Sequence, residues 1–351
     1  MEKVKYHNIE FLRFVFSIII VYLHILHSNI LPYIGMNNDY LVLRELSRNA
    51  AYIVECFFII SGYFLYKNLN DSNNISITKF ILKKIARLGP VLIFSCIIGV
   101  IFFHQSIYPA LFNSLFLQCI GLSLDYRGIN WYISPLFWAL IFYYSLFKLF
   151  DNKKLYIFVG CICYVFYLAN INYCDGRFAR ETVYGIINLG LARALAGIGL
   201  GILIGKGIDE FSGITFRINK KIKFLIISFI EISSTIFLIK YFLLGLKYKN
   251  AFIVVIIFSI LFICFINQCG ALSKLLNLRI FSKLGKYSYS IYVMQQISFW
   301  IMQKSLWKMS IINNTVMCII ISLFFSIFLG IITYYIIEKS FYNFLLNRNV
   351  N

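Results

Sequence analysis

The sequence predicts an all-α, polytopic integral membrane protein in which about ten transmembrane helices form one bundle. Of the 351 residues, 60% are hydrophobic and only 13% are charged, whereas soluble proteins carry about 25% charged residues. The apolar residues also come in long uncharged blocks, which is typical of membrane helices and unlike the alternating pattern of barrel strands. These observations exclude a soluble enzyme, a disordered chain and a nucleic-acid-binding module.

The apolar blocks give ten expected spans, because a helix of about 20 apolar residues crosses a bilayer. The fifth block is short and the sixth contains Arg193, but ten spans preserve the alternation of loop charge described next. Residues 108–122 are too interrupted to span, and we expect a re-entrant or interfacial segment there. In chain order, the expected spans are residues 9–28, 49–66, 88–104, 131–149, 155–170, 183–205, 222–243, 251–267, 287–304 and 312–337.

The formal net charge of +19 lies mainly in the loops between these spans. With ten spans, both chain ends face one side, where the loops and ends hold 21 of the 33 Lys and Arg residues, against 10 in the opposite loops. Loops rich in Lys and Arg stay in the cytoplasm, so we expect both termini to be cytoplasmic. Lipid headgroups, not nucleic acid, are the expected partners of most of this charge.

The first span carries two ionisable residues on one face. Arg13 and His24 are 11 residues apart, which is three helical turns plus about 20°, or about 16 Å along the axis. Charged side chains inside a bilayer cost about 2.5–3.5 kcal/mol on insertion scales and usually serve a function. The alternatives are an interfacial arginine anchor and a hydrogen-bonded packing histidine. His27, nearer the outer surface, is expected to be a packing residue.

Ionisable residues also occur in later spans. Glu55 lies inside the second span and needs a partner, and Arg193 is expected to face the bundle interior and pair with a carboxylate. Glu338 ends the tenth span and is either functional or a solvated boundary residue. Glycines at every fourth position of residues 197–205 predict close packing on a neighbouring helix.

Basic residues gather before the third span, where residues 83–90 read KKIARLGP. Lys84 and Arg87 are three residues apart and share a helix face, and Lys83 adds a third cation. Such a cluster at a membrane entrance suits a phosphate-bearing ligand, with a lipid-headgroup anchor as the alternative. The chain has no HExxH, CxxC, Walker or GxSxG motif, and we expect no metal.

Several segments, in order, resemble the membrane acyltransferase 3 family. That family has an arginine and a histidine in the first helix with ten residues between them, as Arg13 and His24 have, and Glu10 occupies its acidic position before the arginine. The resemblance predicts a single transmembrane domain over residues 1–351. Its further segments are FFIISG (57–62), KKIARLGP (83–90), NWYISPLFWAL (130–140), SYSIYVMQ (288–295) and IIEKSF (336–341).

Two positions depart from the family pattern. Gln295 stands where many members have histidine, so we assign it no proton chemistry. Residues 130–140 lack the glutamate that many members carry there, although Trp131 matches.

The resemblance implies a membrane O-acetyltransferase-like enzyme. It would move an acyl group, in the first instance acetyl, from cytoplasmic acyl-CoA to a hydroxyl of an extracytoplasmic or lipid-linked glycan in a bacterial plasma membrane. His24 would act as general base or transient acyl carrier. The implied residues are His24, Arg13 and Glu10 for catalysis, Arg87, Lys84, Lys83 and Ser61 for the acyl-CoA donor, and Trp131 and Glu338 for the acceptor.

Other readings of the same residues stay open. A transporter or flippase for a glycan or small polar solute would also have many helices and buried charges, and a non-catalytic scaffold for polysaccharide assembly is a third reading. The sequence leaves undecided the identity of the acceptor, acetyl against succinyl transfer and the oligomeric state.

Overall fold

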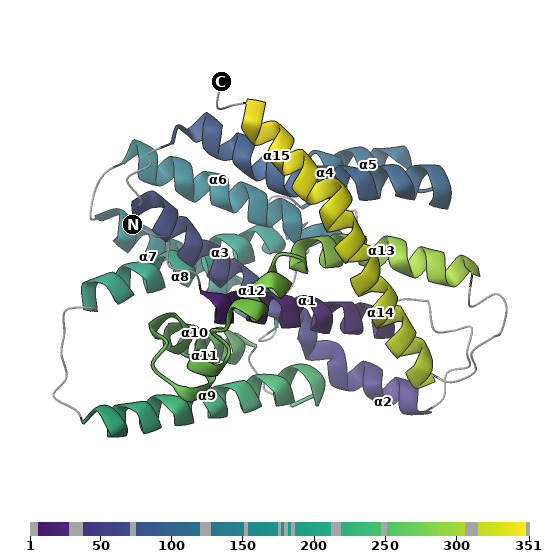
Figure 1. Ribbon diagram of the computed structural model, residues 1–351. Helices are drawn as coiled ribbons and strands as arrows, with labels where there is room; N and C mark the ends of the chain where they lie inside the picture. Colours follow the sequence, from purple (N-terminus) through teal and green to yellow (C-terminus); the bar gives the residue numbers. More distant parts are fainter. Residues whose placement is uncertain are drawn as a thin grey trace.

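The computed structural model is a bundle of long helices (Figure 1). It describes residues 6–27, 38–70, 75–119, 128–150, 154–174, 177–178, 182–183, 187–211, 219–246, 251–305 and 315–348. Within these residues, eight helices are long and apolar enough to cross a membrane. The predicted fold class, an all-α polytopic membrane bundle, is therefore confirmed.

The helices differ in length. The long helices are α1 (His7–His27), α3 (Ile53–Asn70), α4 (Ile77–Phe103), α6 (Ile133–Leu149), α7 (Lys154–Tyr173), α8 (Leu189–Phe211), α9 (Lys220–Leu243), α10 (Phe252–Asn267), α13 (Ser288–Ser305) and α14 (Thr315–Thr333). The short ones are α2 (Asn38–Ser47), α5 (Ile107–Ser114), α11 (Ala271–Leu275), α12 (Arg279–Gly285) and α15 (Lys339–Arg348). Two 3₁₀ turns, η2 (Arg48–Tyr52) and η3 (Ile129–Tyr132), a π-helical turn, η4 (Tyr334–Glu338), and an antiparallel strand pair, β1 (Thr182–Val183) and β2 (Ile187–Asn188), complete the described elements.

Each of the ten expected spans coincides with a helix, although two of these helices are not among the eight. The eighth expected span corresponds to α10, which has 16 residues. The ninth corresponds to α13, which has 18 residues and several polar side chains, including Gln295 and Lys304. The count of ten and the cytoplasmic position of the termini stay predictions.

Helix α4 begins 11 residues earlier than the span expected at residues 88–104. Ser76 caps its first turn, because the Ser76 side chain accepts a hydrogen bond from the Lys79 backbone N–H at 3.3 Å, as N-cap serines commonly do. The basic segment at residues 83–90 is therefore helical over its whole length.

Helix α8 begins at Leu189, six residues later than the expected sixth span. Asn188 explains this start, since its side-chain oxygen accepts a hydrogen bond from the Leu191 N–H at 2.9 Å. The stretch 108–122, expected to be re-entrant or interfacial, contains the eight-residue helix α5, which packs on α4. The last residues of that stretch lie outside the described part of the chain.

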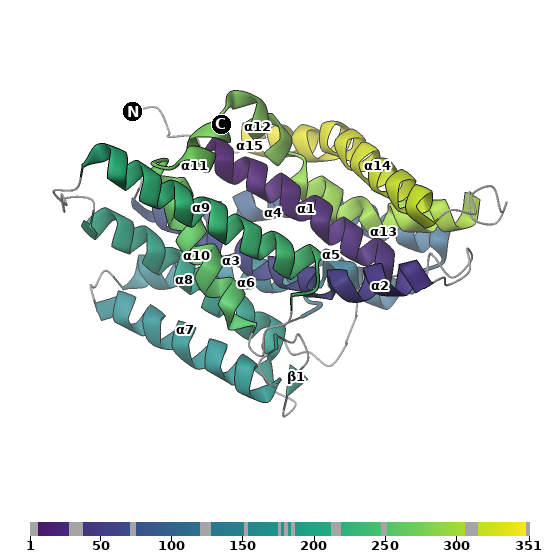
Figure 2. The ribbon, with the colours of Figure 1, turned by 90° about the horizontal axis from the view of Figure 1, so that it is seen from below.

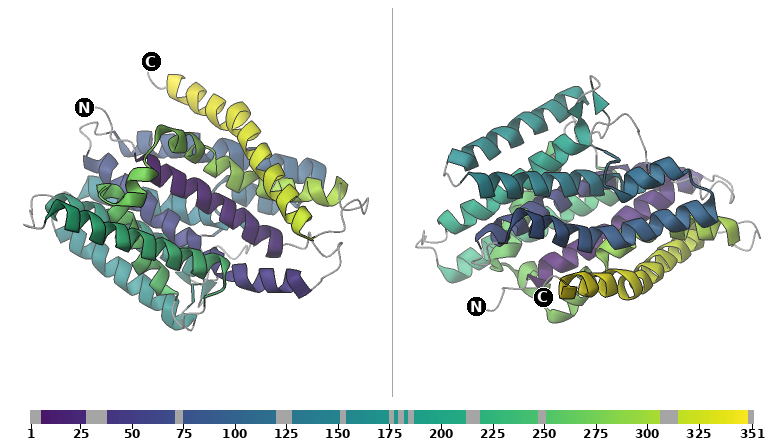
Figure 3. Two further views of the ribbon diagram at one scale, coloured as in Figure 1. Left: turned by 60° about the horizontal axis from the view of Figure 1, so that its bottom comes forward. Right: turned by 90° about the horizontal axis from the view of Figure 1, so that it is seen from above.

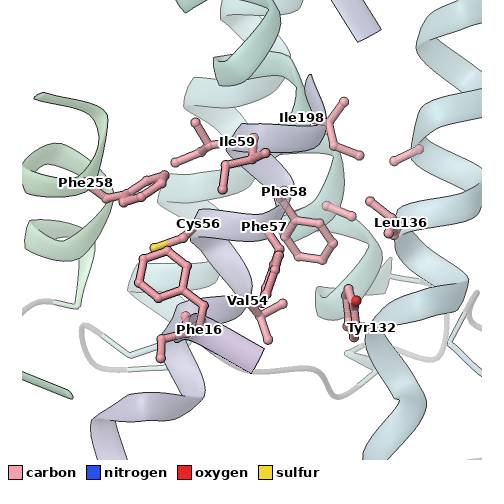
Figure 4. Close-up of a cluster of buried hydrophobic side chains, with 14 of the residues drawn as sticks. Phe16, Val54, Cys56, Phe57, Phe58, Ile59, Tyr132, Leu136, Ile198 and Phe258 are labelled. Atoms are coloured by element: carbon pink, nitrogen blue, oxygen red, sulfur yellow. The ribbon is translucent and has the colours of Figure 1, made fainter. Parts of the chain in front are cut away.

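Helix α3 is well buried and packs closely on α8. Residues 53–60 of α3 are all buried, and Figure 4 shows Phe58 of α3 near Ile198 of α8. A methyl group added at Gly201 would lie 2.1 Å from the Ile59 carbonyl oxygen. Only glycine permits this approach, so the close packing predicted for residues 197–205 is confirmed.

Helix α1 runs through the interior of the bundle. Figure 2 shows α7 and α14 at opposite edges, with α1 and α3 between them, and α1 contacts α3, α10, α12, α13 and α14. On another face, η4 and α15 pack along α4 (Figure 3). Arg13 and His24 of α1 therefore lie among other helices.

Candidate active site

Near its start, α1 lines a positively charged cavity of about 280 Å³, here called the Arg13 cavity. Arg13 Nη1 donates hydrogen bonds to both carboxylate oxygens of Glu10, at 2.9 and 3.1 Å. Lys84 and Arg87 of α4 and Ser61 of α3 line the same cavity. Three basic side chains, two of them arginines, thus face one carboxylate, and this excess of positive charge suits a phosphate-bearing ligand.

Near its end, α1 lines a larger cavity of about 620 Å³, here called the His24 cavity. His24 Nδ1 lies 3.0 Å from Gln295 Oε1 of α13. Because an amide oxygen only accepts hydrogen bonds, Nδ1 must carry the proton in this contact. In a neutral ring the lone pair is then on Nε2, which is the nitrogen that can take a proton from a hydroxyl.

A third, smaller cavity of about 50 Å³, here called the tyrosine cavity, lies between the other two. It shares Arg13 and Arg87 with the Arg13 cavity and Tyr292 with the His24 cavity. The rings of Tyr132 and Tyr292 meet edge to face, with centroids 4.6 Å apart, and the Tyr292 hydroxyl donates to the Ile129 carbonyl oxygen. The three cavities therefore form a series through the bundle, in which Tyr292 separates the last two.

A buried ion pair lies beside the His24 cavity. Arg193 Nε lies 2.6 Å from Glu55 Oε1, and the two side chains are 4% and 0% exposed. The Arg193 guanidinium also lies 5.1 Å from the ring centre of Trp131 and 5.5 Å from that of Phe178. The prediction that Arg193 faces the interior and pairs with a carboxylate is confirmed, and Trp131 lines the same cavity.

Glu338 ends the π-helical turn η4 and is 6% exposed. Its Oε2 accepts a hydrogen bond from the Ser290 hydroxyl at 2.5 Å, and the charges of Arg87 and Arg13 act on it. The alternative of a solvated boundary residue is therefore wrong. Glu338 is not among the lining residues of the three cavities, and its contact with an acceptor stays a prediction.

The other predicted site residues fall into two groups. Glu10, Arg13, Ser61, Lys84 and Arg87 meet at the Arg13 cavity, while His24 and Trp131 meet at the His24 cavity. Lys83 is exposed on α4 and lines none of the three cavities. The structure therefore does not place it with Lys84 and Arg87 at the Arg13 cavity. Among the described residues, no group of three or more His, Cys, Asp or Glu side chains could hold a metal ion.

Three contributors were missed by sequence reasoning. An amide such as Gln295 does not transfer protons, so the sequence assigns it no proton chemistry, but its oxygen can still orient a histidine. From the sequence, Arg48 and Arg177 are only charges of the outer loops, but both line the His24 cavity. No local sequence pattern marks them, since Arg48 stands in ELSRNAA and Arg177 in YCDGRF.

Replacing Gln295 by leucine is expected to lower kcat for any reaction that uses His24 as a base, with little change in substrate KM. A positioned general base contributes about 10²–10⁴-fold, and loss of its orienting partner should remove about tenfold or more of that. Gln295→Glu keeps an acceptor oxygen and should retain more activity than Gln295→Leu. Equal kcat values for the leucine variant and the wild type would show that the contact does not orient the ring.

Comparison with known proteins identifies a family for this chain. A family model described as an acyltransferase domain matches residues 6–335 of the 351. The match includes all residues that line the three cavities. Neither a search of curated proteins nor a search of solved structures returned a match.

Proposed function

The chain belongs to the acyltransferase 3 family, and we propose that this multi-pass membrane acyltransferase moves an acetyl group from cytoplasmic acetyl-CoA to a hydroxyl of an extracytoplasmic or lipid-linked glycan. The observation that carries the proposal is the series of three cavities through the bundle, with Arg13 at one end and His24 at the other. The proposed location is a bacterial plasma membrane.

The donor would enter through the Arg13 cavity. Its phosphates would meet Arg13, Lys84 and Arg87, whose charges exceed that of Glu10, the acidic residue of this cavity. Ser61 would offer a hydroxyl to the same ligand. The thioester arm would then pass Tyr132 and Tyr292 to reach His24, which requires these two rings to move apart.

The reaction needs one proton acceptor. In direct transfer, His24 Nε2 takes the proton of the acceptor hydroxyl while the hydroxyl oxygen attacks the thioester carbonyl carbon. The carbon–sulfur bond then breaks, and the imidazolium returns the proton to the departing thiolate. In the alternative, Nε2 itself attacks the thioester carbonyl carbon, the carbon–sulfur bond breaks and CoA leaves as the thiolate, so that the acyl group is bound to the ring. In a second step the glycan hydroxyl oxygen attacks this acyl carbon, the bond between the acyl carbon and Nε2 breaks, and the hydroxyl proton passes to the thiolate. Both routes use the contact with Gln295 to hold the proton on Nδ1 and the lone pair on Nε2.

Mass spectrometry of surface glycans from cells with and without this chain tests the proposal. We expect sugars that carry an acetyl group only when the chain is present, and label from radioactive acetyl-CoA on the same sugars in membrane vesicles. A transporter would move the unmodified glycan without labelling it, and a scaffold would do neither. Unlabelled glycan in all conditions, with the chain present at normal amounts, would contradict acyl transfer.

A further inference from the structure

The His24 cavity is positively charged. Its ionisable lining residues include Arg48, Arg177 and Arg193 together with His24, and no Asp or Glu is among the lining residues. A cavity that receives a neutral sugar needs hydrogen-bonding groups but has no need of several guanidinium groups. The charge of this cavity therefore requires an explanation beyond acyl transfer itself.

The three arginines reach the cavity from separate elements. Arg48 belongs to η2, Arg177 follows α7 and Arg193 belongs to α8. The charges of all three act on the hydroxyl of Tyr52, which also lines the cavity. Arg177 and Arg193 are 129 and 145 positions from Arg48 in the chain, yet all three line the same cavity.

The excess charge comes from Arg48 and Arg177. Arg193 is paired with Glu55 at 2.6 Å, which offsets its charge. Arg48 is 3.8 Å from Glu45, but both side chains are more than 60% exposed, and such surface pairs contribute little. Among the residues that the structure describes, Arg177 forms no ion pair with a carboxylate. Two guanidinium groups are thus available at the cavity that holds His24.

We propose that the acceptor glycan bears a carboxylate or phosphate close to the hydroxyl that is acylated, and that Arg48 and Arg177 bind this anion. The inference rests on the proposed function, because it names the acceptor class for the same site. Guanidinium groups suit both anions, since each can receive two parallel hydrogen bonds from one arginine. The aromatic rings of Trp131 and Phe178, which flank Arg193, add flat apolar surface for the sugar.

Binding to the purified chain in detergent tests the inference without any need for catalysis. One arm uses an oligosaccharide of glucuronic acid and N-acetylglucosamine and its carboxyl-reduced, neutral counterpart. The other arm uses a phosphorylated oligosaccharide and the same compound after phosphatase treatment. We expect the charged member of at least one pair to bind about tenfold or more tightly, because hydrogen bonds between ionised groups are about twice as strong as those between neutral groups. We expect this binding to weaken with salt.

The double variant Arg48→Gln/Arg177→Gln is expected to remove that preference while leaving the KM for acetyl-CoA unchanged. Arg44→Gln/Lys240→Gln removes the same formal charge from side chains that do not line the cavity, and it should retain the preference. This control separates local binding from the overall field of a basic protein.

Three results would overturn the inference: equal binding of charged and neutral members in both pairs, no binding of either charged probe, or a preference that persists in the double variant. Acyl transfer from labelled acetyl-CoA in the same preparations is a separate readout. Its absence would contradict the proposed function, whereas transfer to neutral and charged acceptors with equal KM would contradict only the anionic acceptor.

Discussion

Replacing His24 by alanine is expected to lower the rate of acyl transfer by about 10²–10⁴-fold, the range that a positioned general base contributes. His24 lines the cavity of about 620 Å³, and its ring is oriented by Gln295 at 3.0 Å. Alanine removes the proton acceptor but leaves the Arg13 cavity intact, so binding of the acyl-CoA donor should be retained. Label transferred from acetyl-CoA to glycan, measured per amount of protein in the membrane, gives the rate.

His27→Ala is the matched control for this variant. His27 lies one turn further along α1, where its Nδ1 is 3.0 Å from the Leu23 carbonyl oxygen, and it is not among the lining residues of the His24 cavity. The His27→Ala variant should therefore retain most of the acyl-transfer activity. Full transfer by His24→Ala at normal membrane levels would remove His24 from the reaction, whichever of the two chemical routes the enzyme uses.

Replacing Glu55 by alanine is expected to destabilise the fold by about 3–5 kcal/mol, because it leaves a buried guanidinium without its carboxylate. The Glu55 side chain is 0% exposed and Arg193 is 4% exposed, so water cannot readily take the place of the lost partner. The change should appear as a lower Tm of the protein in detergent and as less protein in the membrane.

Two further variants separate charge from packing at this pair. Glu55→Gln keeps the shape and a hydrogen-bond acceptor, and it should cost less than Glu55→Ala. Glu55→Leu/Arg193→Met removes both charges and should recover much of the lost stability, as replacement of buried ion pairs by apolar residues often does. If Glu55→Ala unfolds at the wild-type temperature, the pair does not stabilise the bundle.

The sequence alone predicts the fold class and identifies the individual polar residues that lie inside the bundle. Long apolar blocks predict membrane helices because the lipid environment admits little else. Spacing placed Arg13 and His24 on one face of a helix, and the structure places both at cavities. The free-energy cost of placing a charged side chain inside the membrane predicts that Arg193 pairs with a carboxylate. It does not identify that carboxylate as Glu55, which is 138 residues away in the chain.

The other residues of the site come together through contacts between distant segments, which no local sequence pattern predicts. Gln295 approaches His24 only because α13 packs on α1. Arg48 and Arg177 belong to stretches that read as loop charge, and they become lining residues only when η2 and the end of α7 meet near α8. Lys83 shows the reverse case, since its position next to Lys84 in sequence directs its side chain to another side of α4, where it is exposed.

In the proposed reaction, one bundle passes an acyl group from a donor at the Arg13 cavity to an acceptor at the His24 cavity. Sealed proteoliposomes of known protein orientation test it, with labelled acetyl-CoA supplied only at the face that bears the Arg13 cavity and a glycan acceptor enclosed only on the other side. We predict labelled glycan in the wild type and none in His24→Ala. Transfer that occurs only when donor and acceptor share one side of the membrane would contradict the account.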